Sequence, residues 1–98
     1  MRDPATLGDM TALRAEIDAT DKALTALLAH RQSLIDRAAE IKTGAGLPAR
    51  IEARVDEVIA NARRNAEAEG IDPELSETLW RALVDWSIRR EETVLGQE

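Results

Sequence analysis

Hydrophobic residues recur at intervals of three and four positions along most of the chain, which is the spacing of amphipathic α-helices. Glycine and proline interrupt this pattern at only a few places, and the interruptions leave three helix-sized segments. We expect a first helix over roughly Met10–Thr43, a second over Pro48–Glu69 and a third from Pro73 to about Leu95. No strand-like alternation of any length occurs, so the predicted fold class is all-α.

The ends of these segments carry the residues that helix termini prefer. Asp9 or Thr11 is suited to cap the first helix, because a side-chain oxygen there can accept from unpaired backbone N–H groups. Gly70 suits the left-handed position that follows a helix. Asp72 is expected to cap the third helix, with Pro73 at its first position.

The length of the first helix affects the expected assembly. A helix of about 34 residues is roughly 50 Å long, which exceeds the diameter of a compact domain of this size. It cannot bury its whole length against its own chain, so an intertwined homodimer of three-helix subunits is favoured. The alternative is a break near residues 31–33 that gives a short four-helix monomer. The helical domain is predicted over residues 10–95, with flexible ends at residues 1–9 and 96–98.

Two cations lie on the apolar face predicted for the first helix. On a helical wheel, Arg31 lies at the centre of this face, and Lys42 lies on the same side about three turns later. A buried charge without a partner loses its hydration, so an anion is expected to meet them. The ordinary alternative is that Arg31 pairs with an internal carboxylate and that Lys42 extends to solvent. The other residues on this face are Leu13, Ile17, Thr20, Leu24, Leu27 and Ala38.

Two further arginines lie beside the predicted apolar faces. Arg14 is about 100° from Arg31 on the wheel and is expected to point toward another element or another chain. Arg54 lies about 90° from the centre of the apolar stripe of the second helix, where a solvated charge at the rim is the ordinary interpretation. That stripe consists of Ile51, Val55, Val58, Ile59, Ala62 and Ala66.

The third helix has two apolar faces, so we expect it to be covered on both sides. Ser87 and Glu91 lie on or beside the second face. A carboxyl group there tends to stay protonated unless a cation holds it ionised, and an ion pair of Glu91 with Arg31 or Lys42 is the structural alternative. The first face consists of Leu75, Leu79, Ala82, Leu83 and Trp86, and the second of Trp80, Val84, Ile88 and Leu95.

Composition excludes several classes of function. Thirteen Lys and Arg against 19 Asp and Glu give a net charge of −6, which argues against nucleic-acid binding. The absence of cysteine and the single histidine argue against disulfides, thiolate chemistry and metal sites. No apolar run is long enough for a membrane span or a signal core, so we expect a cytoplasmic protein. With two tryptophans and no Phe or Tyr, the core is thin for a monomer.

Several cations and one acid that can stay protonated lie on the apolar helix faces. This combination suggests a pocket for a small dianion. The chain contains no evident nucleophile with its activating partners and no glycine-rich phosphate loop. A mechanism would therefore depend on positioning and electrostatics, which suits a unimolecular reaction of a dicarboxylate.

A series of residues along the chain resembles the all-helical chorismate mutase family over about residues 10–95. The resemblance lies in Leu13–Asp18, Asp21, Leu27–Arg31, Lys42, Pro48 and Arg54. It implies an intertwined homodimer whose long first helix spans both active sites. It also implies the Claisen rearrangement of chorismate to prephenate in the biosynthesis of Phe and Tyr, with no cofactor.

The resemblance assigns roles to individual residues. Arg14 would reach into the site of the partner subunit and bind one carboxylate of the substrate, while Arg31 would bind the other carboxylate in its own subunit. Lys42 would donate to the ether oxygen that gains charge as the C–O bond breaks. Arg54, Val55 and Ser87 are further candidate substrate-binding positions.

The sequence departs from the family pattern at two positions. Glu91 stands where many of these mutases have a glutamine beside the ether oxygen, and it can donate there only when protonated. Val55 stands where bacterial mutases often have a glutamate that contacts the substrate hydroxyl, and in this it is similar to isochorismate-pyruvate lyases. The alternatives are therefore such a lyase or a mutase of an amino analogue of chorismate, and finally a non-enzymatic helical dimer.

Overall fold

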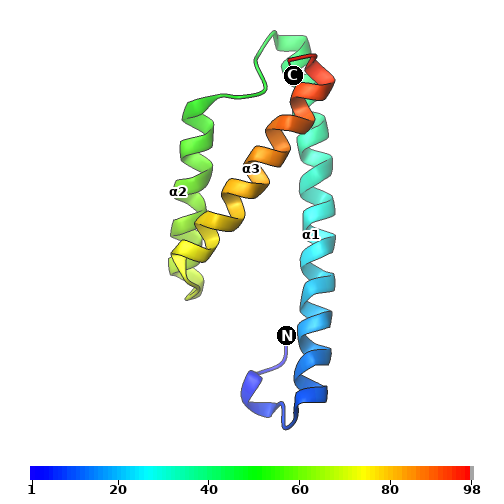
Figure 1. Cartoon of the computed structure of the whole chain (residues 1–98), viewed down its shortest axis with the longest axis vertical. Coiled ribbons are helices and arrows are strands. Elements are labelled where there is room, and N and C mark those ends of the chain that lie inside the picture. Colours follow the sequence, from blue (N-terminus) through cyan, green and yellow to red (C-terminus); the bar gives the residue numbers. More distant parts are fainter. Residues whose placement is uncertain (98) are drawn as a thin grey trace. The chain divides into compact units, whose positions relative to one another are not determined.

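The computed structural model describes residues 1–97 and consists of helices joined by short loops (Figure 1). A short 3₁₀ turn, η1 (Pro4–Thr6), precedes α1 (Met10–Ala45), α2 (Glu52–Glu69) and α3 (Pro73–Leu95). No strand occurs within residues 1–97, so the prediction of an all-α chain with three helices is confirmed. Because α1 is continuous through residues 31–33, the four-helix alternative is wrong. No helix in the described part of the chain is long and apolar enough to cross a membrane.

The chain divides into two compact units, Met1–Leu34 and Ile35–Glu98. The first unit contains η1 and most of α1. Asp9 caps α1 as predicted, because its Oδ1 accepts from the backbone N–H of Ala12 at 2.7 Å. No residue of this unit is buried, and residues 21–30 are all exposed in the single chain. Its exposed large apolar side chains are Met1, Met10, Ile17, Leu24, Leu27, Leu28 and Leu34.

The second unit contains the hydrophobic core. The predicted stripe of α2 faces this core, with Ile59, Ala62 and Ala66 buried. Burial of these side chains against α3 removes apolar surface from water and provides the main favourable term in the stability of this unit. The buried core cluster consists of Ala49, Ile59, Val84 and Ile88, and Val55, Val58, Trp80 and Leu95 pack against it.

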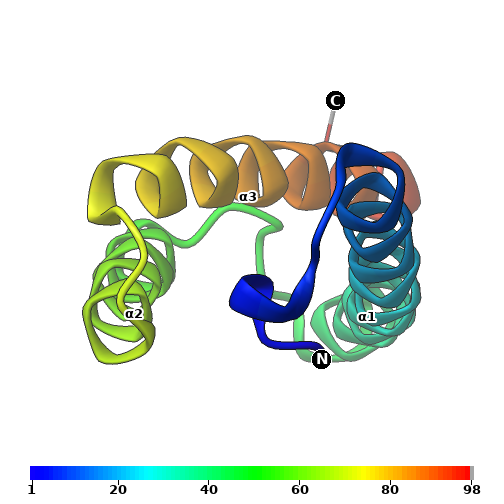
Figure 2. The same ribbon diagram turned by 90° about the horizontal axis from the view of Figure 1, so that it is seen from below.

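The turn between α2 and α3 forms as its sequence predicts. Gly70 adopts a left-handed conformation with φ 76°, and its N–H caps the end of α2. Asp72 accepts from the N–H of Glu74 at 2.9 Å and caps α3, with Pro73 at the first helical position. The two helices lie together at this joined end and diverge away from it (Figures 1 and 2).

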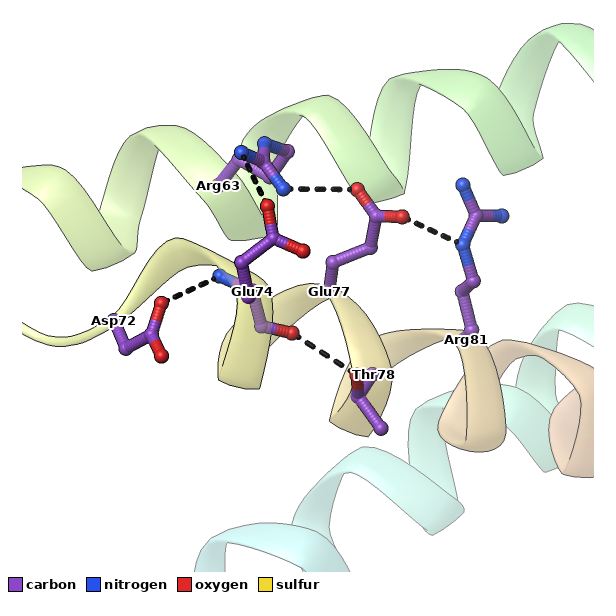
Figure 3. Close-up of polar contacts among 6 residues, drawn as sticks. All are labelled: Arg63, Asp72, Glu74, Glu77, Thr78 and Arg81. Atoms are coloured by element: carbon purple, nitrogen blue, oxygen red, sulfur yellow. Dashed lines mark hydrogen bonds and ion pairs between the residues drawn. The ribbon is translucent and has the colours of Figure 1, made fainter.

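Charged side chains connect α2 and α3 beside this turn (Figure 3). Arg63 on α2 lies 3.1 Å from Glu77 and 3.6 Å from Glu74 on α3. Arg81 donates to the other carboxylate oxygen of Glu77 at 3.0 Å. The hydrogen bond from Arg81, assisted by that from Arg63, lowers the pKa of Glu77 despite partial burial. This network fixes the register of the two helices that carry the core.

The predicted start of the second helix is wrong, because α2 begins at Glu52 and not at Pro48. Ala49 is buried, and side chains bind both of its backbone polar groups: Gln97 accepts from its N–H and Lys42 donates to its carbonyl. Residue 51 is extended, with φ −124° and ψ 106°. Local sequence preference alone would have allowed a helical turn over residues 48–51. The tertiary contacts of Ala49 hold this segment outside the helix instead.

The two faces of α3 differ in burial. The face of Val84 and Ile88 is buried, as predicted. The face of Leu75, Leu79 and Trp86 is exposed, so the expectation that both faces are covered is wrong for the single chain within residues 1–97. α3 therefore presents an apolar surface that its own chain leaves open.

Candidate active site

A buried ion pair joins the last turn of α1 to α3 within the unit Ile35–Glu98. The Lys42 Nζ atom lies 2.8 Å from Oε1 of Glu91, and the two side chains are 18% and 5% exposed. The ion-pair alternative for Glu91 is thus confirmed with Lys42 as the cation. The interpretation that Lys42 extends to solvent is wrong, since the carboxylate and the carbonyl of Ala49 hold its ammonium group inside.

The position of the Lys42 ammonium is fixed by a second contact. Its Nζ donates to the backbone carbonyl of Ala49 at 2.7 Å. An ammonium group has three donors. The Ala49 carbonyl engages one of them, and Glu91 contacts the group as an ion pair. The remaining N–H can bind an oxygen atom of a ligand without loss of the contacts that hold the group in place.

Glu91 has unused hydrogen-bonding capacity. Its Oε1 is buried and, within residues 1–97, accepts no hydrogen bond of ordinary geometry. The contact with Lys42 is therefore mainly electrostatic. Ser87 lies one turn earlier on the same buried face of α3 and donates to the carbonyl of Leu83 at 2.7 Å.

The two candidate residues of α2 point in different directions. Arg54 forms an ion pair with Glu57, and its side chain is 62% exposed. This position agrees with the interpretation of Arg54 as a rim charge in the single chain. Val55 is half-buried and packs against the core cluster. It offers no polar side-chain atom to a ligand.

The remaining two candidates, Arg14 and Arg31, belong to the unit Met1–Leu34. Arg14 is exposed on α1, whereas Arg31 is half-buried. The expectation that Arg14 points toward another element or another chain stays a prediction.

Sequence reasoning missed the ion pair between Asp36 near the end of α1 and Arg90 on α3. Arg90 on α3 donates to both carboxylate oxygens of Asp36, at 2.5 and 3.1 Å, and its guanidinium lies 5.3 Å from the centre of the Trp86 ring. The hydrogen bond from Arg90 lowers the pKa of Asp36. The partners are 54 residues apart in the chain, so no helical spacing indicates this pair.

The geometry of the Lys42 site favours one kind of chemistry. A fixed cation with a free donor can stabilise an oxygen atom that becomes negative, and the adjacent carboxyl group can donate when protonated.

Comparison with known proteins gives a consistent result. The family described as chorismate mutase type II matches residues 13–92. The "T-protein" of Enterobacter agglomerans is 40% identical over 78 residues, which cover 80% of this chain but only 21% of that protein. The "4-amino-4-deoxychorismate mutase" of Streptomyces pristinaespiralis is 36% identical over 90 residues, which cover 91% of this chain and 70% of that protein. No solved structure gives a significant match.

The family match extends from the first turn of α1 to the end of α3 and includes every candidate site residue. It confirms the resemblance seen in the sequence and the class of enzyme that this resemblance implies, an isomerase. The chain belongs to the chorismate mutase type II family.

Proposed function

We propose that the protein is a chorismate mutase that converts chorismate to prephenate, in the route to Phe and Tyr. The observation that carries this proposal is the buried pair of Lys42 and Glu91, in which a fixed ammonium lies beside a carboxyl group with unused hydrogen-bonding capacity. Both residues lie within the part of the chain that the family matches.

The rearrangement breaks the ether C–O bond and forms a C–C bond in one concerted step, without transfer of a proton. Negative charge develops on the ether oxygen as the C–O bond lengthens. Lys42 donates to this oxygen from a position that Ala49 fixes in advance. A preorganised donor of this kind contributes on the order of 10²–10³ in rate, and the remainder comes from holding the substrate in its compact reactive conformer.

Glu91 acts in its protonated form. While ionised, it neutralises Lys42 and repels a dianionic substrate. Once protonated, it leaves the ammonium available to the substrate and can itself donate to the ether oxygen.

The working enzyme is an intertwined homodimer in this proposal. Arg14 binds a substrate carboxylate in the site of the partner subunit, and Arg31 binds the other carboxylate in its own. Two observations support the dimer: the exposed apolar side chains of α1 in the unit Met1–Leu34, exemplified by Leu24 and Leu27, and the exposed face of α3 around Trp86. Apolar patches of this kind mark surfaces that a partner covers.

The proposed reaction is tested by following the loss of chorismate absorbance, with chromatographic identification of the product. Prephenate as the only product, formed in proportion to enzyme concentration, is the expected result. Arg31→Ala should nearly abolish turnover and leave the assembly folded, as judged by circular dichroism. Chorismate that remains unchanged at high enzyme concentration would overturn the proposal.

A second candidate function is the same rearrangement of an amino analogue of chorismate. Val55 favours it, because a half-buried aliphatic side chain cannot hydrogen-bond the hydroxyl group of chorismate. The similarity to the Streptomyces pristinaespiralis protein, which is named for that reaction, also supports it. Parallel assays with chorismate, 4-amino-4-deoxychorismate and isochorismate decide the matter through the ratio of kcat/KM values. Pyruvate and salicylate from isochorismate would instead indicate a lyase.

A further inference from the structure

The C-terminal end of α3 lies beside the last turns of α1 (Figures 1 and 2) and carries a hydrogen bond that the family resemblance does not assign. Gly96 ends α3 in a left-handed conformation with φ 72°. The N–H groups of Gly96 and Gln97 both donate to the carbonyl of Glu92 and close this turn. The side chain of Gln97 then reaches the loop between α1 and α2, where its Oε1 accepts from the N–H of Ala49 at 2.8 Å.

The same residue, Ala49, binds Lys42 through its other backbone group. Its carbonyl accepts from the Lys42 Nζ atom at 2.7 Å. Two side chains from distant parts of the chain therefore hold the N–H and the C=O of one buried residue, which is 2% exposed. The chain of contacts runs from Gln97 through Ala49 to Lys42 and ends at Glu91.

The loop has little else to hold this residue in orientation. Among residues 1–97, positions 48–50 make no backbone–backbone hydrogen bond. Pro48 has no N–H to offer, and the helical ladder of α2 starts only at Ile51, whose carbonyl accepts from Arg54 and Val55. Loss of the Gln97 contact would leave the N–H of a buried residue unpaired, so the loop would turn to find another partner.

We propose that Gln97 is a positioning residue for the reaction. Through the backbone of Ala49, Gln97 holds the Lys42 ammonium at the place where this group meets the negative charge that develops on the substrate. This inference depends on the proposed mutase function for its effect on rate. The hydrogen-bond chain itself is independent of the reaction. A small displacement of a catalytic donor lowers the rate strongly, because electrostatic stabilisation requires the donor to be in place before the reaction.

Two substitutions separate positioning from general structure. Gln97→Leu keeps the approximate size of the side chain and removes the acceptor, while Gln97→Glu keeps an acceptor oxygen at the same distance along the side chain. We expect Gln97→Leu to lower kcat roughly tenfold and to change KM by less than about twofold, since Lys42 acts on the transition state. Gln97→Glu should stay within about twofold of wild type in both parameters.

A second readout does not require turnover. Amide hydrogen exchange measured by NMR on the full chain should show a protected Ala49 N–H in the wild type and in Gln97→Glu, and a rapidly exchanging one in Gln97→Leu. The amides of Ile59 and Ile88 in the core report whether the fold as a whole has changed, and they should remain protected in all three proteins.

The two readouts together distinguish failure of this inference from failure of the proposed function. Wild-type enzyme that does not convert chorismate would overturn the function, and the exchange data would still test the contact. The positioning role is overturned if Gln97→Leu keeps the kcat of wild type, whether or not the Ala49 amide is exposed. It is equally overturned if Gln97→Glu loses as much kcat as Gln97→Leu.

Discussion

The two units of the chain use the same kinds of side chain in opposite ways. In Ile35–Glu98, aliphatic residues such as Ile59 and Ile88 meet across helices and are buried. In Met1–Leu34, the side chains of Leu24 and Leu27 are 53% and 68% exposed. Exposed leucines at helical spacing on a long helix contribute little to a monomer. The first set stabilises a fold that one chain completes, and the second set is suited to contact another copy.

The candidate site residues follow the same division. Lys42 and Glu91 lie within the unit Ile35–Glu98, and one chain provides the contacts that fix them. Arg14 is exposed in the unit Met1–Leu34. One chain alone therefore fixes the position of Lys42, the proposed donor to the ether oxygen, whereas the proposed contribution of Arg14 depends on assembly.

The largest effect is expected from removal of the Lys42 charge. Lys42→Met should lower kcat by about 10²–10³, because the donor to the ether oxygen is lost. It should also destabilise the fold by on the order of 3 kcal/mol, because Glu91 is left buried without its cation. Turnover by stopped assay and chemical denaturation would measure the two effects.

The matched control for this variant is Lys42→Met combined with Glu91→Gln. The second substitution removes the uncompensated charge, so most of the lost stability should return while kcat stays low. Activity that returned together with stability would show that Lys42 has a structural role only.

A mixed dimer tests the division of the site between copies. Arg14→Ala and Lys42→Met are each expected to be nearly inactive as homodimers. In a random mixture, half of the dimers are heterodimers of one Arg14→Ala subunit and one Lys42→Met subunit. Of the two active sites in each heterodimer, one combines an intact Arg14 with an intact Lys42. Coexpression or refolding of an equal mixture should restore about a quarter of wild-type activity. No restoration in verified heterodimers would mean that Arg14 acts in its own subunit.

A third change addresses the exposed leucines directly. Leu27→Glu should raise the dissociation constant of the dimer by about 100-fold or more, because a carboxylate in an apolar interface loses its hydration. Activity should then fall on dilution, and sedimentation velocity should follow the same concentration dependence. Ala29→Glu adds the same charge about 160° away from Arg31 on the helix and serves as the control. A Leu27→Glu monomer with full activity would contradict the proposed assembly.

The sequence was sufficient to predict the parts of the fold that depend on local spacing. The three helices follow from periodicity, and the caps at Asp9, Gly70 and Asp72 follow from the chemistry of helix ends. The start of α2 was not predictable in this way. The buried backbone of Ala49 is held by residues up to 48 positions away in the chain, and such contacts override local preference.

The candidate site was predictable to the extent that it depends on helix faces. The position of Lys42 on the apolar side of α1 indicated a buried anion as its partner, and the pairing with Glu91 agrees with this. The wheel could not show Gln97, because a residue beyond the end of a helix has no defined face. It also could not show Arg90, whose contact with Asp36 depends on how α3 crosses the end of α1 within its unit.

The smallest effect at neutral pH is expected from Glu91→Gln, which tests whether the proposed role of Glu91 requires a protonated carboxyl group. If only the protonated form is active, kcat/KM should fall as the pH rises, because the ionised carboxylate pairs with Lys42 and opposes the dianion. Glu91→Gln should flatten this profile between about pH 5 and 9, since an amide donates at every pH. Asp36→Asn removes a carboxylate from the same unit and is the control. Arg90 lowers the pKa of Asp36, so Asp36 stays ionised over this range and its substitution should leave the slope unchanged. A profile that keeps its slope in Glu91→Gln would show that another group causes the pH dependence and would contradict the proposed role of the Glu91 proton.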